Sequence, residues 1–237
     1  MGASSFSFKQ FTIFHDKCAM KVGTDGVLLG AWADISNAKS VLDIGTGSGL
    51  IALMLAQRCD ATITAIDIEP SAIVQANINT ASSPWPKRIA NLEVSLQHFT
   101  QNSNQQFDLI VSNPPFFKNA LTNPDDKRTL ARHAEKHFHN ELILSAKKLL
   151  YPDGKLCLIL PIDEGTQCIQ LATEQALFCT KEVVVYPKPA SKAKRLLLEF
   201  SPTYSQPNIS ELTIESENRH EYTPEFTNLV KNFYLKL

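Results

Sequence analysis

The chain has 237 residues, of which 43% are hydrophobic, and its formal net charge is −1. This length and apolar content suit one α/β domain whose core needs neither disulfides nor metals. The small net charge excludes binding of nucleic acid through a global positive field, so any basic surface must be local.

Strands and helices alternate along most of the chain. Alternating apolar residues predict a strand over 6–13, and an apolar run at 27–35 predicts a helix that Thr24 or Asp25 could cap. The pattern then predicts strands at 41–44, 62–66, 92–96, 107–111 and 155–160, and helices at 50–58, 70–81, 142–150 and 164–177. Strands with helices between them indicate a parallel sheet with crossover connections.

The last part of the chain departs from this alternation. The β-rich segments 181–186 and 195–200 are joined by a proline-containing loop that is too short for a helix, which predicts an antiparallel hairpin. A short strand at 212–214 and a helix at 224–234 follow. This arrangement resembles the Rossmann-like, seven-stranded, mostly parallel sheet of class I methyltransferases. We therefore expect an amino-terminal cap at 1–36 and a methyltransferase domain at 37–237, folded as a single unit.

A glycine-rich turn follows the strand that ends at residue 44. Gly45, Gly47 and Gly49 allow a tight turn and close approach of a ligand, and the next helix points free N–H groups there. Asp67 ends the following strand, where a carboxylate can accept both hydroxyls of a ribose. The turn also fits a dinucleotide fingerprint, so a nicotinamide oxidoreductase and a turn without ligand remain alternatives. Asp43 favours a cationic ligand group over a pyrophosphate, because like charges repel.

The segment Asn113-Pro114-Pro115-Phe116 follows the strand at 107–111. The Asn113 side-chain carbonyl and the Pro114 backbone carbonyl can accept the two hydrogens of a planar amine, which favours its pyramidal transition state. Pro115 helps to fix the backbone, and the Phe116 ring can stack on a base. A rigid loop without ligand is the alternative for this segment alone, but both motifs together indicate methylation of an amine.

These motifs resemble those of class I amino-group methyltransferases. The block from His15 to Trp32 and the terminal Phe233-Tyr234-Leu235 resemble the bacterial valine-tRNA adenine-N6 methyltransferases, and the resemblance runs over nearly the whole chain. It implies a tRNA substrate, methylated by S-adenosylmethionine at the adenosine 3′ of the anticodon. It also implies cofactor contacts from Asp43, Gly45, Gly47, Gly49 and Asp67, with Asn113 and Pro114 at the amine and Phe116 stacked on the base. Thr24, Ile68 and Ser95 are further candidates for contact with the cofactor.

Two positions depart from this family. Ser95 stands where many relatives have an acidic residue at the end of the third strand, and Phe116 stands where they often have tyrosine. Asn-Pro-Pro-Phe also occurs in enzymes that methylate the guanine amine of ribosomal RNA, and a glutamine amide is equally planar. A guanine-N2 methyltransferase, a protein glutamine-N5 methyltransferase and an RNA-binding protein with a dead site therefore stay open.

Two local basic segments are candidates for RNA contact. The candidate residues are Lys188, Lys192, Lys194 and Arg195 of the hairpin, and Lys118, Arg132 and His133 of a polar segment that could be a mobile flap ordering on RNA. Ordinary solvated loops are the alternative for both segments. His133 and His137 have the i, i+4 spacing of metal ligands on a helix but lack the acid of H-E-x-x-H, so we predict no metal.

The cysteines and the apolar runs predict the compartment. The five cysteines are widely spaced and form no C-x-x-C pair, so we expect mostly buried free thiols in a reducing environment. No apolar run reaches the roughly 18 residues of a membrane span, and the amino terminus lacks the apolar core of a secretory signal. The sequence predicts a soluble cytoplasmic protein and leaves its oligomeric state open.

Overall fold

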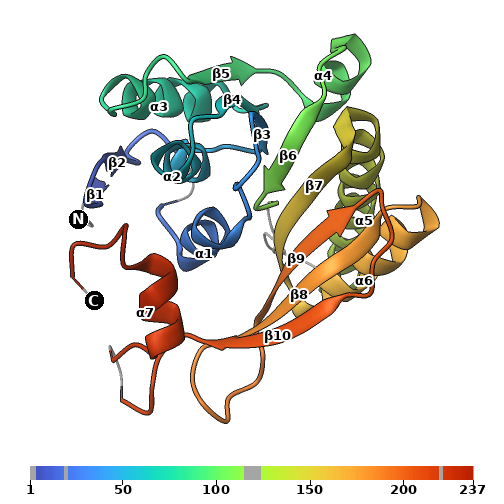
Figure 1. Ribbon diagram of the computed structural model, residues 1–237. Helices are drawn as coiled ribbons and strands as arrows, with labels where there is room; N and C mark the ends of the chain where they lie inside the picture. The colour runs from blue at the N-terminus through green and yellow to red at the C-terminus, as the bar shows by residue number, and fades with distance from the viewer. Residues whose placement is uncertain (1–3, 19–20, 115–123, 219–220, 237) are drawn as a thin grey trace.

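The computed structural model describes residues 4–18, 21–114, 124–218 and 221–236, and for 124–136 it describes the backbone alone (Figure 1). Eight strands form one large sheet. In spatial order they are β10 (Asn208–Thr213), β8 (Phe178–Tyr186), β9 (Arg195–Ser201), β7 (Leu150–Pro161), β6 (Phe107–Ser112), β3 (Ser40–Ile44), β4 (Thr62–Asp67) and β5 (Ile89–Glu93).

Strand directions confirm the predicted architecture and add one strand. β3 to β7 run parallel, whereas β9 is antiparallel to both β7 and β8. The outermost strand, β10, pairs in parallel with β8 and covers six residues, where the sequence suggested only 212–214. The sheet thus has eight strands instead of seven, because the exposed and largely polar β10 lacks the apolar pattern that marks the inner strands.

Helices cover both faces of the sheet (Figure 1). One face carries α1 (Thr24–Trp32), α2 (Leu50–Arg58), α3 (Pro70–Ala81) and α7 (Pro224–Val230), and the other carries α4 (Leu96–Asn102), α5 (Pro124–Leu149) and α6 (Ile162–Glu174). Side chains along each inner strand alternate between two cores. In β6, Leu109 and Val111 join the first core and Ile110 joins the second. The inner strands are apolar on both sides, as expected for a parallel sheet between two helical layers.

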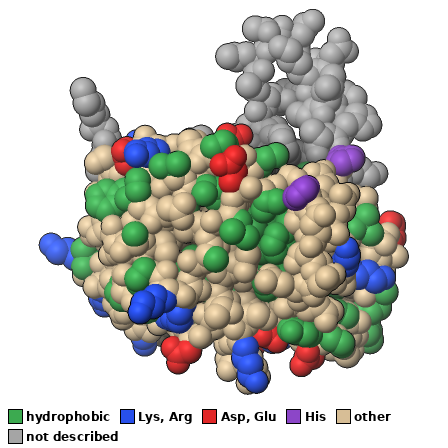
Figure 2. Space-filling view, turned by 90° about the horizontal axis from the view of Figure 1, so that it is seen from above, with side chains coloured by type: hydrophobic (Ala, Val, Ile, Leu, Met, Phe, Trp, Pro, Cys, Tyr) green, Lys and Arg blue, Asp and Glu red, His purple; other side chains and the backbone are tan. Residues whose placement is uncertain are grey.

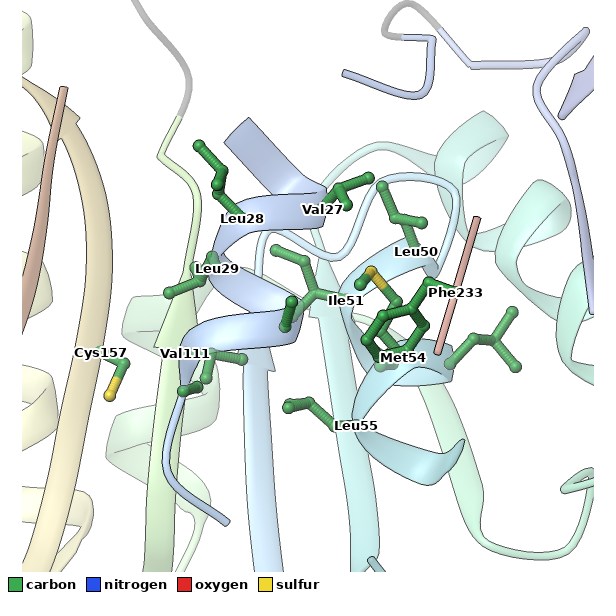
Figure 3. Packing of buried hydrophobic residues seen from close by; sticks show 14 of the residues in the cluster. Val27, Leu28, Leu29, Leu50, Ile51, Met54, Leu55, Val111, Cys157 and Phe233 are labelled. Carbon is green, nitrogen blue, oxygen red and sulfur yellow. The ribbon is translucent and has the colours of Figure 1, made fainter. Parts of the chain in front are cut away.

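The first core lies where α1 packs on α2 and on the sheet (Figure 3). A Cβ atom at Gly30 would lie 2.8 Å from the Met54 sulfur, so glycine permits this close helix packing. α1 begins three residues before the predicted segment, and the predicted side-chain cap is wrong. The N-cap is Gly23, which has no side chain to form a cap, and Asp25 accepts a hydrogen bond from Arg195.

The amino-terminal segment forms a hairpin of two strands, β1 (Ser5–Ser7) and β2 (Thr12–Phe14), where one strand over 6–13 was predicted. The chain turns between Phe8 and Phe11, and the Phe8 ring stacks on Phe11 and on Tyr234 near the carboxyl terminus. Two distant segments therefore share the first core, and the proposal that residues 1–36 and 37–237 fold as one unit is consistent with this packing.

Three elements in the middle of the chain differ from the strands and helices that the sequence predicted. The strand predicted at 92–96 ends at Glu93, because Ser95 is the N-cap of α4, and its hydroxyl oxygen accepts a hydrogen bond from the His98 N–H. The helix predicted at 142–150 is only the end of α5, whose polar first half hides its helical period. The strand predicted at 155–160 begins earlier, because β7 starts at Leu150 and continues through the predicted turn at 152–154. The pairing of β7 with β6 shifts its register there.

The base of the β8–β9 hairpin is fixed by a cluster of charges. Glu199 of β9 is 3% exposed and lies 3.0 Å from the Lys181 ammonium and 3.8 Å from that of Lys155. Lys155 also lies 2.9 Å from Asp34, which follows α1. Because a buried charge needs partners, this cluster ties the hairpin to the first helical layer.

All five cysteines are free thiols, but only Cys157 and Cys168 are fully buried, fewer than expected. Among the described residues, no helix is long and apolar enough to cross a membrane. The other predicted strands and helices between residues 40 and 201 lie within three residues of their predicted bounds.

Candidate active site

Three predicted motifs meet at one edge of the sheet. β3 lies between β4 and β6, and the ends of these strands are in register. Gly45 directly follows β3, Asp67 ends β4, and Asn113 directly follows β6. Neighbouring strands are about 4.8 Å apart, so the three residues lie in a row at the carboxyl edge of the sheet.

The glycine turn forms an open cradle. Gly45, Gly47 and Gly49 have φ angles of 72°, 55° and 81°, a region that side chains other than glycine rarely adopt. No heavy atom lies within 4 Å of where a Cβ would stand at Gly45 or Gly47, whereas a Cβ at Gly49 would lie 3.5 Å from Ala76. The first two glycines therefore face open space, and the third packs onto α3.

Asp67 connects this cradle to β4. Its Oδ2 accepts a hydrogen bond from the Gly47 N–H at 2.8 Å, and its Oδ1 accepts one from the Glu69 N–H at 3.0 Å. Each carboxylate oxygen has a second lone pair, so the oriented carboxylate can still accept the hydroxyls of a ribose.

Asp43 lies beneath the turn and is 0% exposed. Its Oδ2 accepts a hydrogen bond from the Thr46 hydroxyl at 2.7 Å, and the Ala52 N–H in the first turn of α2 also hydrogen-bonds this carboxyl. Burial raises the pKa of this carboxyl from 3.8 to about 7, against the opposing effects of the Thr46 and Ala52 hydrogen bonds. In its charged form this carboxyl would attract a cationic group bound above it.

Asn113 offers a buried hydrogen-bond acceptor at the same edge of the sheet. Its side-chain oxygen is buried and has no partner among the described residues. The preceding Ser112 hydroxyl donates to the Ile44 carbonyl at 2.8 Å and fixes the end of β6 beside β3. Pro114 is buried. Pro115 and Phe116 lie outside the described residues, so the stacking role of Phe116 stays a proposal.

The remaining predicted cofactor residues surround the same edge. Ile68 follows β4 and is 67% exposed, and Thr24 is exposed at the start of α1. Ser95 lies two residues beyond β5 and is the N-cap of α4. The acidic residue at the end of the third strand of this region is Glu93, which pairs in register with Asp67. The sequence did not single out Glu93 because the predicted strand was placed too far along the chain.

Two buried amides of α3 were also missed. Gln75 and Asn79 are both 0% exposed and hydrogen-bond to the amino-terminal segment. Their only signal in the sequence is their i, i+4 spacing, which places both on one face of the helix.

The hairpin tip lies at the same edge of the sheet, because β9 begins beside the end of β7. Lys192 and Lys194 are exposed there, while Lys188 lies 3.4 Å from Glu215. Arg195 donates from its Nε to Asp25 at 2.8 Å. On the face seen in Figure 2, Lys and Arg side chains stand apart from one another, with Asp and Glu side chains among them.

Other predicted contacts fall outside the described part of the chain. Lys118 lies there entirely, and Arg132 and His133 belong to the part of α5 whose side chains are not described. The predicted histidine pair is therefore untested. Among the described residues, no group of three or more His, Cys, Asp or Glu side chains could hold a metal ion.

Comparison with known proteins supports one assignment. Residues 23–183 match the methyltransferase small domain family. The chain is 49% identical over 98% of both chains to the tRNA1(Val) (adenine(37)-N6)-methyltransferase of Parabacteroides distasonis, and 45% identical over the full length of both to that of Trichodesmium erythraeum. A predicted O-methyltransferase from Agrobacterium tumefaciens has a similar fold, with a TM-score of 0.68 at 18% identity over 88% of this chain and 96% of that one.

Proposed function

The chain belongs to the methyltransferase small domain family and, within it, to the tRNA1(Val) (adenine(37)-N6)-methyltransferases, and from that premise we propose that it methylates the N6 amine of adenine 37 in a valine tRNA. S-adenosylmethionine is the methyl donor of this family. The observation that carries the proposal is the buried Asn113 oxygen, an acceptor without a described partner beside the glycine cradle.

The residues at the carboxyl edge of the sheet fit this cofactor. We assign the nucleoside to the open side of Gly45 and Gly47, the ribose hydroxyls to Asp67, and the cationic amino group to the side of Asp43. Ile68 would contact the adenine ring, and Thr24 and Ser95 would complete the site. When bound, the cofactor supplies an electrophilic methyl group on its sulfonium.

Asn113 and Pro114 act on the other reactant. The exocyclic amine of adenine is a weak nucleophile because its lone pair is delocalised into the ring. Asn113 Oδ1 accepts one N–H and the Pro114 carbonyl accepts the other, which favours a pyramidal nitrogen whose lone pair points at the methyl group. The amine proton leaves to solvent after the nitrogen becomes cationic. This reaction needs alignment and no strong general base.

Basic side chains would hold the tRNA. We propose phosphate contacts for Lys188, Lys192, Lys194 and Arg195 of the hairpin, and for Lys118, Arg132 and His133 of the segment that follows Phe116 in the sequence. Lys192 and Lys194 are the strongest candidates, because their ammonium groups are exposed and no described carboxylate pairs with them. For Arg195, its hydrogen bond to Asp25 supports a bracing role as well.

Methyl transfer from labelled S-adenosylmethionine to bulk tRNA from cells that lack this protein tests the proposal. After nucleoside analysis, we expect N6-methyladenosine at position 37 of one valine tRNA. Label as N2-methylguanosine in ribosomal RNA, or as methylglutamine in protein, would overturn the substrate and keep the chemistry. Stabilisation by NAD and none by S-adenosylhomocysteine would overturn both.

A further inference from the structure

Asn79 of α3 joins two segments that are distant in sequence. Its Nδ2 donates to the Phe14 carbonyl and to the Ser48 carbonyl, both at 2.8 Å, and its Oδ1 accepts from the Phe14 N–H at 2.9 Å. Phe14 ends the amino-terminal hairpin, and Ser48 lies inside the glycine turn. One fully buried carboxamide thus binds both backbone groups of Phe14 and one carbonyl of the cofactor cradle.

Gln75 extends this connection by one helical turn. Its side chain is 0% exposed, and its Oε1 accepts a hydrogen bond from the Lys17 N–H at 2.9 Å. The segment continues to Cys18, which lies near Asp67. Burial, and then the negative charges of Asp16 and Asp67, raise the pKa of the Cys18 thiol to about 11. Residues 14–18 therefore run along α3 from the glycine turn towards the ribose-binding carboxylate.

Buried amides at these positions have a physical reason. Although Phe14 lies opposite Ser5 in the hairpin, its N–H and carbonyl both bond to Asn79, and the Ser48 carbonyl lies in the turn before α2. A buried polar group without a partner costs roughly 1–3 kcal/mol. An apolar residue at position 79 would leave three such groups without their partner. The neighbouring Ala76 lets the turn approach, since a Cβ at Gly49 would already lie 3.5 Å from it.

We infer that Asn79 is a positioning residue for the methyl donor, and that with Gln75 it holds residues 14–18 as one wall of the cofactor site. The inference rests on the proposed methyl transfer. Asn79 fixes the glycine turn and the wall relative to each other, and Gln75 holds the part of the wall that approaches Asp67. Both act on binding of the donor and leave the amine-binding Asn113 in place.

The variant Asn79→Leu tests this inference, because leucine has a similar volume and cannot form the three hydrogen bonds. We expect S-adenosylhomocysteine to bind at least tenfold more weakly in calorimetry. The KM for the donor should rise in parallel, while kcat stays within about threefold. The matched control is Asn77→Ala, an exposed asparagine on the same helix, which should change none of these values. Unchanged donor affinity in a folded Asn79→Leu protein would overturn the inference.

Gln75→Met is a milder second variant in case Asn79→Leu does not fold. It keeps Asn79 and removes only the bond to Lys17, so we expect a few-fold loss of donor affinity. Amide hydrogen exchange at residues 14–18 should become faster in the unliganded variant than in wild type, and unchanged exchange would contradict the tether. If residues 14–18 exchange more slowly in wild type than in the variant but wild type binds no S-adenosylhomocysteine, the proposed function is refuted and the tether is not.

Discussion

The cofactor edge and the hairpin tip lie on the same side of the sheet but are built differently. At the cofactor edge, Asp67 holds the backbone of the turn, Ser112 holds the end of β6, and Asp43 is fully buried. At the hairpin tip, Lys192 and Lys194 project from a loop. The first site is fixed by short hydrogen bonds between adjacent strands, whereas the second depends on exposed charges. Substitutions at the first should therefore have large, specific effects, and those at the second should have graded effects that depend on salt.

The largest effect is expected from Asn113→Ala. Loss of the acceptor that we assign to the transition state should lower kcat about 10²- to 10³-fold, by analogy with removal of one oxyanion-hole donor. The affinity for S-adenosylhomocysteine should stay within a few-fold, because Asn113 is assigned to the amine. Single-turnover methylation and calorimetry on the same preparation measure the two quantities. A large loss of cofactor affinity would place Asn113 in the cofactor site instead.

Gly47→Ala should weaken cofactor binding about tenfold or more. Its φ of 55° disfavours alanine by roughly 1–2 kcal/mol, and the added methyl would enter the open space assigned to the cofactor. Gly154→Ala is the matched control, because its methyl would meet the Phe107 carbonyl oxygen at 2.8 Å, away from the cradle. We expect the control to lower the free energy of unfolding and to leave cofactor affinity unchanged. The same pattern in both variants would mean that the cradle is only a structural turn.

Asp43 should make the unliganded protein less stable as the pH rises. The pKa of this carboxyl is 3.8 in its ordinary state and about 7 in the folded protein, because burial disfavours the charge. Between these values the folded state holds a proton that the unfolded chain has released, so the free energy of unfolding falls with rising pH and levels off above about pH 7. The loss is on the order of a few kcal/mol.

Urea denaturation of wild type and Asp43→Asn at pH 5 and pH 8 isolates this contribution from those of other groups. We expect the free energy of unfolding to fall more between pH 5 and pH 8 in wild type than in Asp43→Asn. An equal fall in both proteins would show that Asp43 titrates normally and is not held in an apolar site.

The same contrast explains what could be predicted from the sequence. The glycine turn, Asp67 and Asn113 were found because each directly follows a strand with a clear apolar pattern, so the sheet topology alone brings them together. Asn79 could not be found, because its role depends on the hairpin at Phe14 reaching α3. The partner of Arg195 was equally hidden, since Asp25 lies 170 positions away. α4 was missed because its seven residues are too few to establish a helical period.

The smallest and most salt-dependent effect is expected from the double variant Lys192→Ala/Lys194→Ala. If each ammonium neutralises one phosphate, the dependence of log K on log salt should flatten by about 0.7–0.9 per lost contact, and kcat with saturating tRNA should be unchanged. Lys87→Ala, an exposed lysine just before β5 at the opposite edge of the sheet, serves as the control and should leave the slope unchanged. An unchanged slope in the lysine variant would exclude the hairpin tip from the tRNA interface and leave the segment that contains Lys118 and Arg132 as the proposed site of phosphate contact.

The variant Arg195→Ala separates a bracing role of Arg195 from RNA contact. Loss of the pair with Asp25 should lower the free energy of unfolding by up to about 1 kcal/mol. If the salt dependence of tRNA binding keeps its wild-type slope in this variant, Arg195 has the bracing role alone.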